Sequence, residues 1–309
     1  MVSDSGPSTK ASQYDVAIVG GGVAGLSAAL VLGRCCRRVL LCSSGERRNA
    51  SAEAVHGFLT RDGIKPAELI RVSFDQLAAY KGVRVREARV LAAARDQAGF
   101  VLRLGTGRKV TCRRLLIASG VVDELPPIPG IRELYGRSIF HCPYCDGWEV
   151  RHRRILIYGD GEIALTLIQT LRCWSRMLFW CTPDSARSTL TDQRVSRWGI
   201  KVYTENIGEL EVSDGKLTGV RFLNGERLRC EAIFFANENH QRSDLAAQLG
   251  CRQTSKGLVK ANEVGLTSEE GVYVAGDAKA DVQLAIIAAG EGAKAAYAIN
   301  KSLIEAEHQ

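Results

Sequence analysis

The sequence predicts an α/β protein with two Rossmann-like nucleotide-binding domains, each a three-layer ββα unit, the second inserted into the first. Two glycine-rich turns, at residues 20–25 and 159–164, each follow a short apolar run, and a later apolar run ends in Gly276-Asp277. A glycine-rich turn between a strand and a helix is typical of folds that bind dinucleotides. Because the last run follows the whole second unit, we expect it to return to the first sheet.

The first turn joins a predicted strand at residues 14–19 to a predicted helix at 24–32. In this pattern Gly20 permits the tight turn and Gly22 lets the backbone approach a pyrophosphate, while Gly25 lets the helix pack close to the sheet. The phosphates would then lie on free N–H groups at the helix N-terminus. A GxGxxG pattern is weak evidence alone, but inside a full strand–loop–helix–strand it predicts a nucleotide site.

The acid that commonly binds the ribose is missing at the end of the next predicted strand, residues 38–42. Cys42, Ser43 and Ser44 stand there, and Glu46 is the nearest candidate. The first site therefore departs from the usual pattern at its ribose end.

The second unit repeats the order of the first. A predicted strand at residues 154–158 leads into Gly159-x-Gly161-x-x-Ala164, and a predicted helix follows at 165–171. Alanine is a usual variant at the third position of this turn. The sequence therefore predicts a second dinucleotide loop.

Two segments mark the boundaries of the second unit. Residues 123–130 are rich in proline and residues 236–244 are polar, as is common in linkers between domains. The predicted organisation is a disordered N-terminal tail at 1–13, a first nucleotide-binding domain formed by 14–122 and 245–309, and an inserted nucleotide-binding-like domain at 123–244.

The segment Cys142-Pro143-Tyr144-Cys145-Asp146-Gly147 carries the chemistry. Two thiols at this spacing form a reversible disulfide, and an acid directly after them can give or take a proton. Half of a zinc site has the same spacing, but zinc needs a second pair of ligands. No second CxxC exists among the other cysteines, which are at positions 35, 36, 42, 112, 173, 181, 230 and 251. The pattern therefore predicts a redox-active disulfide and no metal site.

Composition narrows the class of protein. The chain has 309 residues, 46% of them hydrophobic and 24% charged, which is ordinary for a globular protein of two domains. The net charge of +7 comes from scattered arginines that do not alternate with aromatic residues, so we expect no nucleic-acid partner. No apolar run approaches the length of a membrane span and no signal-peptide pattern is present, so we expect a cytoplasmic protein with no membrane partner.

The order of GxGxxG, Ala118-Ser119-Gly120, CxxCDG, GxGxxA and Ala275-Gly276-Asp277 resembles the low-molecular-weight thioredoxin reductase family, from about Tyr14 to Ile304. Five motifs in one order are far more specific than any single motif. The resemblance implies a homodimeric flavoprotein in which the first domain binds FAD and the inserted domain carries the disulfide. It also implies a thioredoxin-like protein or a small-molecule disulfide or dithiol as partner.

The resemblance also implies roles for individual residues. Cys145 is similar to the thiol that faces the flavin, and Cys142 to the interchange thiol that attacks a substrate disulfide. Asp146 resembles the acid–base residue that protonates a departing thiolate. His141, just ahead of Cys142, either assists proton transfer or packs as a structural histidine.

The same resemblance implies two sets of cofactor contacts. The set for FAD is Gly20, Gly22, Ala24, Gly25, Ser43, Glu46, Asn49, His56, Ala118, Ser119, Gly120, Gly276, Asp277, Gln283, Leu284 and Ala285. The set for a nucleotide in the second site is Gly159, Gly161, Glu162, Ile163 and Ala164.

The second site departs from the members of the family that use NADPH. Those members carry a cluster resembling His-Arg-Arg-x-x-x-Arg, which holds the 2′-phosphate, where residues 181–187 here read CTPDSAR. Only Arg187 remains, and Asp160 and Glu162 add negative charge in the loop itself. Each lost charge-assisted hydrogen bond removes about 1.5–3 kcal/mol, so use of NADPH is doubtful. NADH does not need those contacts, but the negative charges near its pyrophosphate make its use doubtful as well.

Relatives without this cluster resemble diflavin-linked disulfide oxidoreductases, in which a second FAD takes the place of NADPH. The CPYC segment also resembles a branch that includes small-molecule dithiol oxidases. Tyr158, Trp174 and Trp180 either belong to the core or stack on another ring. The sequence thus favours an FAD-dependent disulfide oxidoreductase without normal NADPH use. An NAD(P)H-dependent thioredoxin reductase, a dithiol oxidase and a non-catalytic flavin redox sensor are the alternatives.

Overall fold

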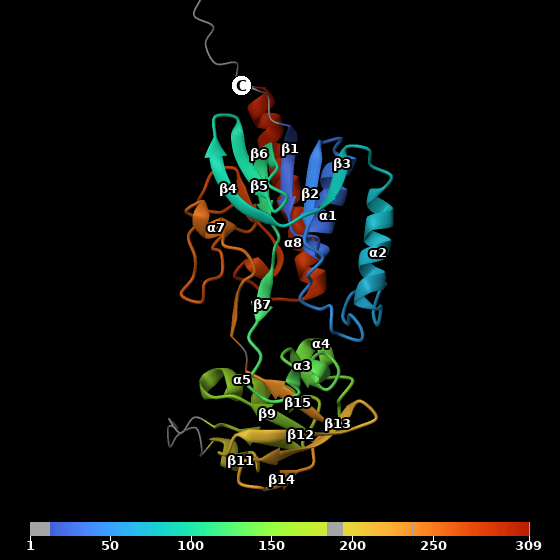
Figure 1. The fold of residues 1–309 in the computed structure, drawn as a ribbon, viewed down its shortest axis with the longest axis vertical. Helices are drawn as coiled ribbons and strands as arrows, with labels where there is room; N and C mark the ends of the chain where they lie inside the picture. Colours follow the sequence, from blue (N-terminus) through green and yellow to red (C-terminus); the bar gives the residue numbers. More distant parts are fainter. Residues whose placement is uncertain (1–12, 184–193, 237, 309) are drawn as a thin grey trace, which may run out of the picture.

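A large sheet forms the first unit, drawn in the upper half of Figure 1. The computed structural model describes residues 13–183, 194–236 and 238–308. The strands of this sheet are β1 (Tyr14–Val19), β2 (Val39–Ser43), β3 (Val83–Glu87), β4 (Val90–Asp96), β5 (Gly99–Leu104), β6 (Lys109–Ile117) and β17 (Val272–Val274). Their order is β3-β2-β1-β6-β5-β4, and β17 pairs with β6 in parallel. The late strand therefore returns to the first sheet, as predicted.

Helices pack against this sheet, and the close approach of two of them requires a glycine at their contact. They are α1 (Val23–Arg34), α2 (Pro66–Leu77), α7 (Leu245–Gln248) and α8 (Ala285–Glu307), with a short 3-10 turn η1 (Gly276–Ala278). Helices α1 and α8 approach so closely that a Cβ atom at Gly292 would lie 2.0 Å from the carbonyl oxygen of Ala24. Strand β1 is buried throughout, and from Val16 to Val19 its apolar residues pack alternately into cores on opposite faces of the sheet.

The second unit lies below the first in Figure 1 and has its own parallel sheet. Its strands are β8 (Ile139–Phe140), β9 (Ile155–Tyr158), β10 (Leu178–Cys181), β11 (Lys201–Tyr203) and β15 (Ala232–Phe235), in the order β11-β10-β9-β15-β8. An antiparallel sheet of β12 (Ile207–Ser213), β13 (Lys216–Phe222) and β14 (Arg227–Leu228) covers it. Its helices include α3 (Ile131–Leu134), α4 (Pro143–Asp146) and α5 (Gly161–Leu171). The predicted α/β class with two Rossmann-type units is confirmed.

The two connecting segments pair with each other. Strand β7 (Val121–Asp123) runs antiparallel to β16 (Asn239–Gln241), so the polar segment predicted as a plain linker contains a short strand. Part of the predicted tail, residues 1–12, lies outside the described residues. Gln13 already belongs to the fold, because its N–H donates to Thr111 Oγ1 at 3.0 Å.

Three aromatic side chains of the second unit belong to its packing. Trp180 is 1% exposed and its Nε1 donates to the carbonyl of Gly159 at 2.8 Å, so the suggestion that it stacks on a cofactor is wrong. Tyr158 is buried in the neighbouring core, and Trp174 packs edge-on against Tyr144 of α4.

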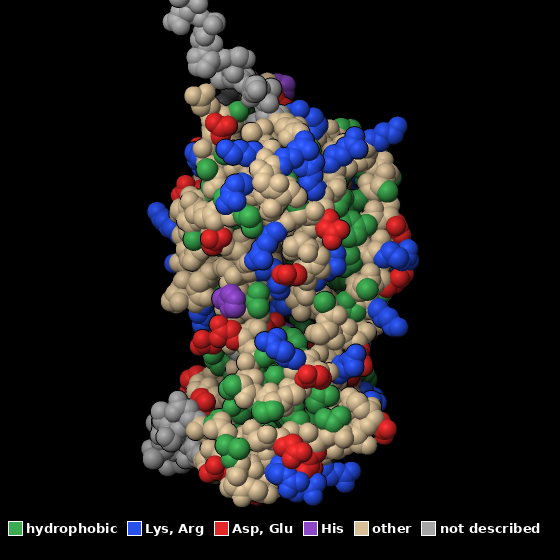
Figure 2. Space-filling model, viewed as in Figure 1, with side chains coloured by type: hydrophobic (Ala, Val, Ile, Leu, Met, Phe, Trp, Pro, Cys, Tyr) green, Lys and Arg blue, Asp and Glu red, His purple; other side chains and the backbone are tan. Residues whose placement is uncertain are grey.

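On the face drawn in Figure 2, cationic and anionic side chains are interspersed over both units. Within the described residues, no helix is long and apolar enough to cross a bilayer.

Candidate functional site

A cavity of about 580 Å³ lies between the two units. The first unit lines it with the glycine loop at residues 20–22, with residues 118–121 and with the start of α8. The second unit contributes a small group of polar and sulfur-bearing side chains: Tyr135, His141, Cys145 and Asp146. The cavity therefore joins the predicted nucleotide loop to the predicted redox segment.

The first glycine loop has the geometry that a pyrophosphate needs. Gly20 has a φ of 123°, and a Cβ there would lie 2.0 Å from the carbonyl oxygen of Ala118. A Cβ at Gly22 would meet nothing within 4 Å, so the backbone faces open space. Helix α1 then begins at Val23 without an acidic residue in its first turn, so its free N–H groups favour an anion.

Two further observations fit FAD in this cavity. Ser119 lines it, and the buried Oγ of this residue has no hydrogen-bond partner among the described residues, as expected where a polar ligand atom binds. Helix α8 starts at the same cavity, after Leu284, again without an acid in its first turn. The N-terminus of α1 would hold the pyrophosphate, and that of α8 a polar edge of the flavin ring.

A disulfide joins Cys142 to Cys145, whose Cα atoms are 5.3 Å apart. Cys142 is the N-cap of α4, and Pro143 fixes the first turn of that helix. Cys145 lies inside α4 and lines the cavity, whereas Cys142 is not among the lining residues. The two sulfurs are therefore inequivalent toward any ligand in the cavity.

Asp146 is placed to carry a proton. Burial, and then the charge of Glu149, raise the pKa of this carboxyl to about 7. A group that titrates near neutral pH beside a disulfide can protonate a departing thiolate and can also take a proton back.

His141 is neutral near pH 7. Burial lowers the pKa of its imidazole to about 4, against the opposing attraction of Asp123. Its Nδ1 lies 3.0 Å from the hydroxyl oxygen of Tyr135. An imidazole that is already protonated at neutral pH is thus excluded, and Asp146 is the group beside the disulfide that titrates there.

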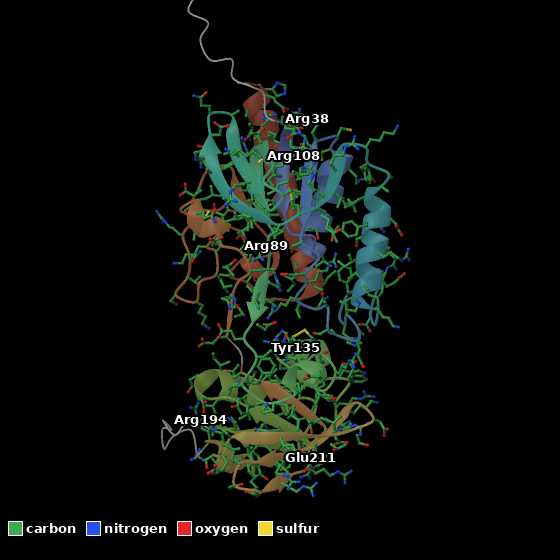
Figure 3. All side chains as sticks on the ribbon, in the orientation of Figure 1. Arg38, Arg89, Arg108, Tyr135, Arg194 and Glu211 are labelled. Atoms are coloured by element: carbon green, nitrogen blue, oxygen red, sulfur yellow. A yellow bond between two sulfur atoms is a disulfide. The ribbon has the colours of Figure 1, made fainter. Side chains whose placement is uncertain are left out.

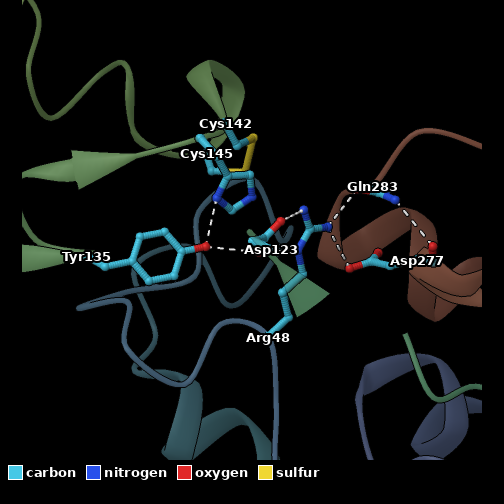
Figure 4. Close-up of a disulfide and its surroundings, with 8 residues drawn as sticks. Arg48, Asp123, Tyr135, Cys142, Cys145, Asp277 and Gln283 are labelled. Carbon is cyan, nitrogen blue, oxygen red and sulfur yellow. Dashed lines mark hydrogen bonds and ion pairs between the residues drawn. A yellow bond between two sulfur atoms is a disulfide. The ribbon is translucent and has the colours of Figure 1, made fainter. Parts of the chain in front are cut away.

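Arg48, which the sequence did not single out, lies at the centre of the site (Figure 4). Its guanidinium donates to both carboxylate oxygens of Asp123, at 2.8 and 2.5 Å. Its third nitrogen donates to Asp277 at 3.0 Å and to Gln283 at 2.7 Å. Burial alone would lower the pKa of Arg48, but the two carboxylates hold it above its ordinary value. Arg48 therefore ties the loop after β2 to the connector and to the start of α8.

Comparison with known proteins identifies the family. The model of the family "Pyridine nucleotide-disulphide oxidoreductase" matches residues 14–292. The chain belongs to this family. Thioredoxin reductase tcpT of Claviceps purpurea is 30% identical, with 85% of this chain and 86% of that protein covered. The thioredoxin reductase of Treponema pallidum is 28% identical, with 93% and 96% covered.

A solved structure gives the same assignment for the fold. The oxidoreductase from Agrobacterium tumefaciens has a TM-score of 0.87 and 32% identity, with 94% of this chain and 98% of that chain covered. The chain is a flavin-dependent disulfide oxidoreductase similar to thioredoxin reductases, and FAD is its cofactor. The alternative of a non-catalytic flavin sensor is set aside.

In this disulfide oxidoreductase the cavity contains most of the predicted FAD contacts. Those lining it are Gly20, Gly22, Ala24, Glu46, Asn49, His56, Ala118, Ser119, Gly120, Gly276, Asp277, Gln283, Leu284 and Ala285. Gly25 does not line it, because a Cβ there would lie 2.0 Å from the carbonyl oxygen of Gly20, which is its predicted packing role. Ser43 does not line it either. Its side chain is buried against Gly21, and its neighbours Cys42 and Ser44 face the cavity instead.

The second glycine loop of the oxidoreductase has a shape similar to the first. Gly159 has a φ of 126°, and a Cβ there would lie 2.8 Å from the side chain of Ala236. Gly161 has a φ of 69°, and a Cβ there would meet nothing within 4 Å. Helix α5 starts directly at this loop, so the loop retains the geometry of a nucleotide site.

The charges around the second loop differ in part from the prediction. Cys181 and Thr182 are buried at the end of β10, and the Thr182 hydroxyl hydrogen-bonds to Asp160. The rest of the expected clamp region, residues 184–187, lies outside the described residues. Glu162 is not an uncompensated negative charge, because Arg194 (labelled in Figure 3) pairs with it at 3.0 Å.

Other residues that the sequence analysis missed also line the cavity. They include three arginines, Arg47, Arg89 and Arg242. Arg242 lies beside Glu46, with 3.3 Å between a guanidinium nitrogen and a carboxylate oxygen. The one sequence feature that could have indicated arginines in the cavity was the Arg47-Arg48 pair after the second strand. In the described part of the chain, no group of His, Cys, Asp and Glu side chains is arranged to hold a metal ion.

Replacing Arg48 by methionine is expected to lower the free energy of unfolding by about 3–5 kcal/mol. The change removes the guanidinium of Arg48 from the buried carboxylate of Asp123, which is 4% exposed. Urea unfolding followed by fluorescence, with FAD content measured alongside, checks this. Arg71→Met is the control, because Arg71 pairs with Glu68 and Asp75 on the exposed surface of α2. Equal effects of the two changes would contradict the role of Arg48.

Proposed function

We propose that this chain moves two electrons between FAD and the Cys142–Cys145 pair, and between that pair and a disulfide or dithiol outside the protein. Cys145 and Asp146 share the cavity of the glycine loop, whereas Cys142 does not line it, and this observation carries the proposal. FAD supplies two-electron chemistry when bound. Cys145 is then the thiol that faces the flavin, and Cys142 is the thiol that exchanges with the substrate.

Thiol–disulfide exchange between the substrate and the Cys142–Cys145 pair can run in both directions. A substrate thiolate attacks Cys142 Sγ, the Cys142–Cys145 bond breaks, and Cys145 leaves as a thiolate that Asp146 can protonate. The second substrate thiolate attacks the mixed disulfide, which releases the oxidised substrate and Cys142. In the reverse sense the same steps reduce a disulfide.

We propose a thioredoxin-like protein as the partner, because the relatives from Claviceps purpurea and Treponema pallidum are thioredoxin reductases. Tyr144, which lies between the two cysteines, and Trp148, which follows the segment, have exposed fractions of 71% and 62% and give a partner apolar surface to contact. A small-molecule dithiol is the alternative substrate. A homodimer, testable by sedimentation, and a cytoplasmic location, testable by fractionation of cells, complete the proposal.

We propose further that the chain does not use NADPH normally and that a second FAD occupies the loop at Gly159 and Gly161. The open space at Gly161 and the absence of a cation at residues 181–183 support this. An NAD(P)H-dependent thioredoxin reductase is the alternative, and the Arg194–Glu162 pair keeps a cation beside the loop for either nucleotide.

Anaerobic titration with dithiothreitol tests the electron path. Each dithiol gives two electrons, so one equivalent per chain should reduce the disulfide and the next should bleach one flavin. With Cys145→Ser the flavin should no longer accept electrons through the pair. Bleaching of the flavin at the wild-type rate in that variant would contradict the proposed path.

Asp146→Asn is expected to slow reduction of the disulfide by dithiothreitol about 10²-fold near pH 6. The protonated carboxyl gives its proton to the leaving thiolate, and its pKa of about 7 means that this advantage fades as pH rises through 7. The ratio of wild-type to variant rates should therefore fall between pH 6 and 8. Both rates depend in the same way on the ionisation of dithiothreitol, so that dependence cancels in the ratio. A ratio that stays constant with pH would contradict the role of Asp146 as proton donor.

The same carboxyl makes the folded protein less stable as pH rises. Between its ordinary value of 3.8 and a pKa of about 7, the folded state holds a proton that the unfolded state has lost. The free energy of unfolding therefore decreases with pH across this window. In Asp146→Asn the free energy of unfolding, measured with urea, should decrease less with pH across this window. An equal decrease in the variant would show that the pKa of Asp146 is not raised in the folded state.

A further inference from the structure

A continuous line of hydrogen bonds runs from the start of α8 to the residue before Cys142. Arg48 bonds to Asp277 and Gln283 on one side and to Asp123 on the other. Asp123 accepts from the hydroxyl of Tyr135 at 2.9 Å, and the same hydroxyl oxygen lies 3.0 Å from His141 Nδ1. Figure 4 draws this line beside the disulfide, and Figure 3 places Tyr135 at the junction of the two units.

The chemistry of each group fixes the direction of these bonds. Burial alone would raise the pKa of Asp123, but hydrogen bonds from Arg48 hold it below its ordinary value, so Asp123 is ionised and can only accept. Burial and the charge of Asp123 raise the pKa of Tyr135, so its hydroxyl keeps its single proton. That proton points to the carboxylate. The oxygen of Tyr135 must then accept a proton from His141 Nδ1.

We propose that Tyr135 and Asp123 are positioning residues that keep the ring proton of His141 on Nδ1, so that Nε2 is a bare acceptor at the cavity shared with Cys145. No hydrogen bond to Nε2 joins it to another described residue, and His141 lines the cavity. A neutral imidazole carries one ring proton, so a proton on Nδ1 leaves a lone pair on Nε2. The arrangement is a carboxylate–hydroxyl–imidazole line that selects one tautomer.

The use of this acceptor in catalysis rests on the proposed function. An unprotonated Nε2 can accept a hydrogen bond from a thiol in the cavity and hold that thiol in place, while the proton transfers stay with Asp146, because burial lowers the pKa of His141 to about 4. The opposite tautomer would present an N–H donor at the same place and could not accept. The tautomer itself does not depend on whether the protein turns over any substrate.

Nitrogen-15 NMR of the FAD-loaded protein labelled at histidine tests the tautomer directly. The chain has five histidines, and the signals of His141 are assigned by their loss in His141→Gln. Wild-type protein at pH 7 should show a protonated Nδ1 and an unprotonated Nε2 at His141. Tyr135→Phe removes the acceptor for Nδ1–H, so the Nε2–H form should appear.

A matched control and a reversing variant complete the test. Tyr203→Phe removes the hydroxyl from a buried tyrosine of the same unit that stacks on Phe222 and has no bond to this line, so it should leave the His141 signals unchanged. Asp123→Asn can turn its amide N–H toward Tyr135, which would turn the hydroxyl toward Nδ1 and move the ring proton to Nε2. If Asp123→Asn does not fold, Tyr135→Phe still decides the question.

The rate of electron transfer from dithiothreitol to FAD distinguishes a failure of this inference from a failure of the proposed function. Tyr135→Phe should slow the transfer of electrons from dithiothreitol to FAD about tenfold, because a thiol in the cavity loses the acceptor that positions it, with FAD content unchanged. A protonated Nε2 in the wild type, or an unchanged tautomer in Tyr135→Phe, would overturn the inference. The expected tautomers without any electron transfer in the wild type would instead overturn the proposed function and leave the positioning line intact.

Discussion

Replacing either Cys142 or Cys145 by serine is expected to abolish turnover with an external disulfide while FAD stays bound. Neither thiol belongs to the glycine loop or to the helix N-termini that would hold the cofactor. A single sulfur cannot store the two electrons that the pair stores as a dithiol. Steady-state reduction of a disulfide and the flavin-to-protein ratio measure the two effects separately.

The two variants should differ in their absorption spectra. Cys142→Ser leaves the Cys145 thiol in the cavity, so a charge-transfer band between thiolate and flavin should appear as pH is raised. Cys145→Ser leaves Cys142, which does not line the cavity, and should show no band. Cys173→Ser is the control, because Cys173 is an exposed free cysteine of the same unit. A band in Cys145→Ser alone would reverse the roles assigned to the two thiols.

Local sequence predicted the parts of the site that depend on backbone conformation. Gly20 and Gly159 have φ values of 123° and 126°, which other residues rarely adopt, so the two turns could be recognised from the glycine spacing between a predicted strand and a predicted helix. The disulfide was predictable because its two cysteines are three positions apart and α4 brings them together. Strands β1 and β9 were predictable because each is a mainly apolar run buried on both faces.

The contacts that join distant segments could not be read from the sequence. Arg48 meets Asp123 and Asp277 at separations of 75 and 229 residues, and nothing in the local pattern marks it among the other arginines. Glu162 looked uncompensated because its partner, Arg194, comes 32 residues later. The low pKa of His141 follows from burial between the units, which composition does not reveal. Charge networks and pKa values are therefore properties of the assembled fold.

NADPH is expected to bind weakly, and the purified protein is expected to hold close to two flavins per chain. Cys181 and Thr182 are buried and uncharged where cations would meet a 2′-phosphate. Burial, and then the charge of Asp160, raise the pKa of Cys181 to about 12, so this thiol does not ionise at neutral pH. Losing two charge-assisted bonds of about 1.5–3 kcal/mol each weakens binding by roughly 10²-fold or more. FAD has no 2′-phosphate and does not need those cations.

Quantifying the nucleotides released by heat, followed by anaerobic mixing with NADPH and NADH, measures both expectations. Slow or absent bleaching by NADPH would accompany two flavins per chain. One flavin per chain that is bleached rapidly and completely by micromolar NADPH would restore the NAD(P)H-dependent thioredoxin reductase as the function. Rapid bleaching by NADH alone would show that the second loop takes a pyridine nucleotide without the phosphate.

Gly161→Glu tests whether the proposed second flavin lies on the second loop. The new carboxylate would stand in open space at the N-terminus of α5, where it repels a pyrophosphate, so the flavin content should drop from two to one per chain. Gly199→Glu is a matched control, because Gly199 has a φ of 68° against 69° at Gly161 and equally open surroundings, but lies outside the loop. Both variants carry the same backbone strain and the same added charge. Loss of flavin in both would point to strain, whereas loss in Gly161→Glu alone would place the second flavin on the loop.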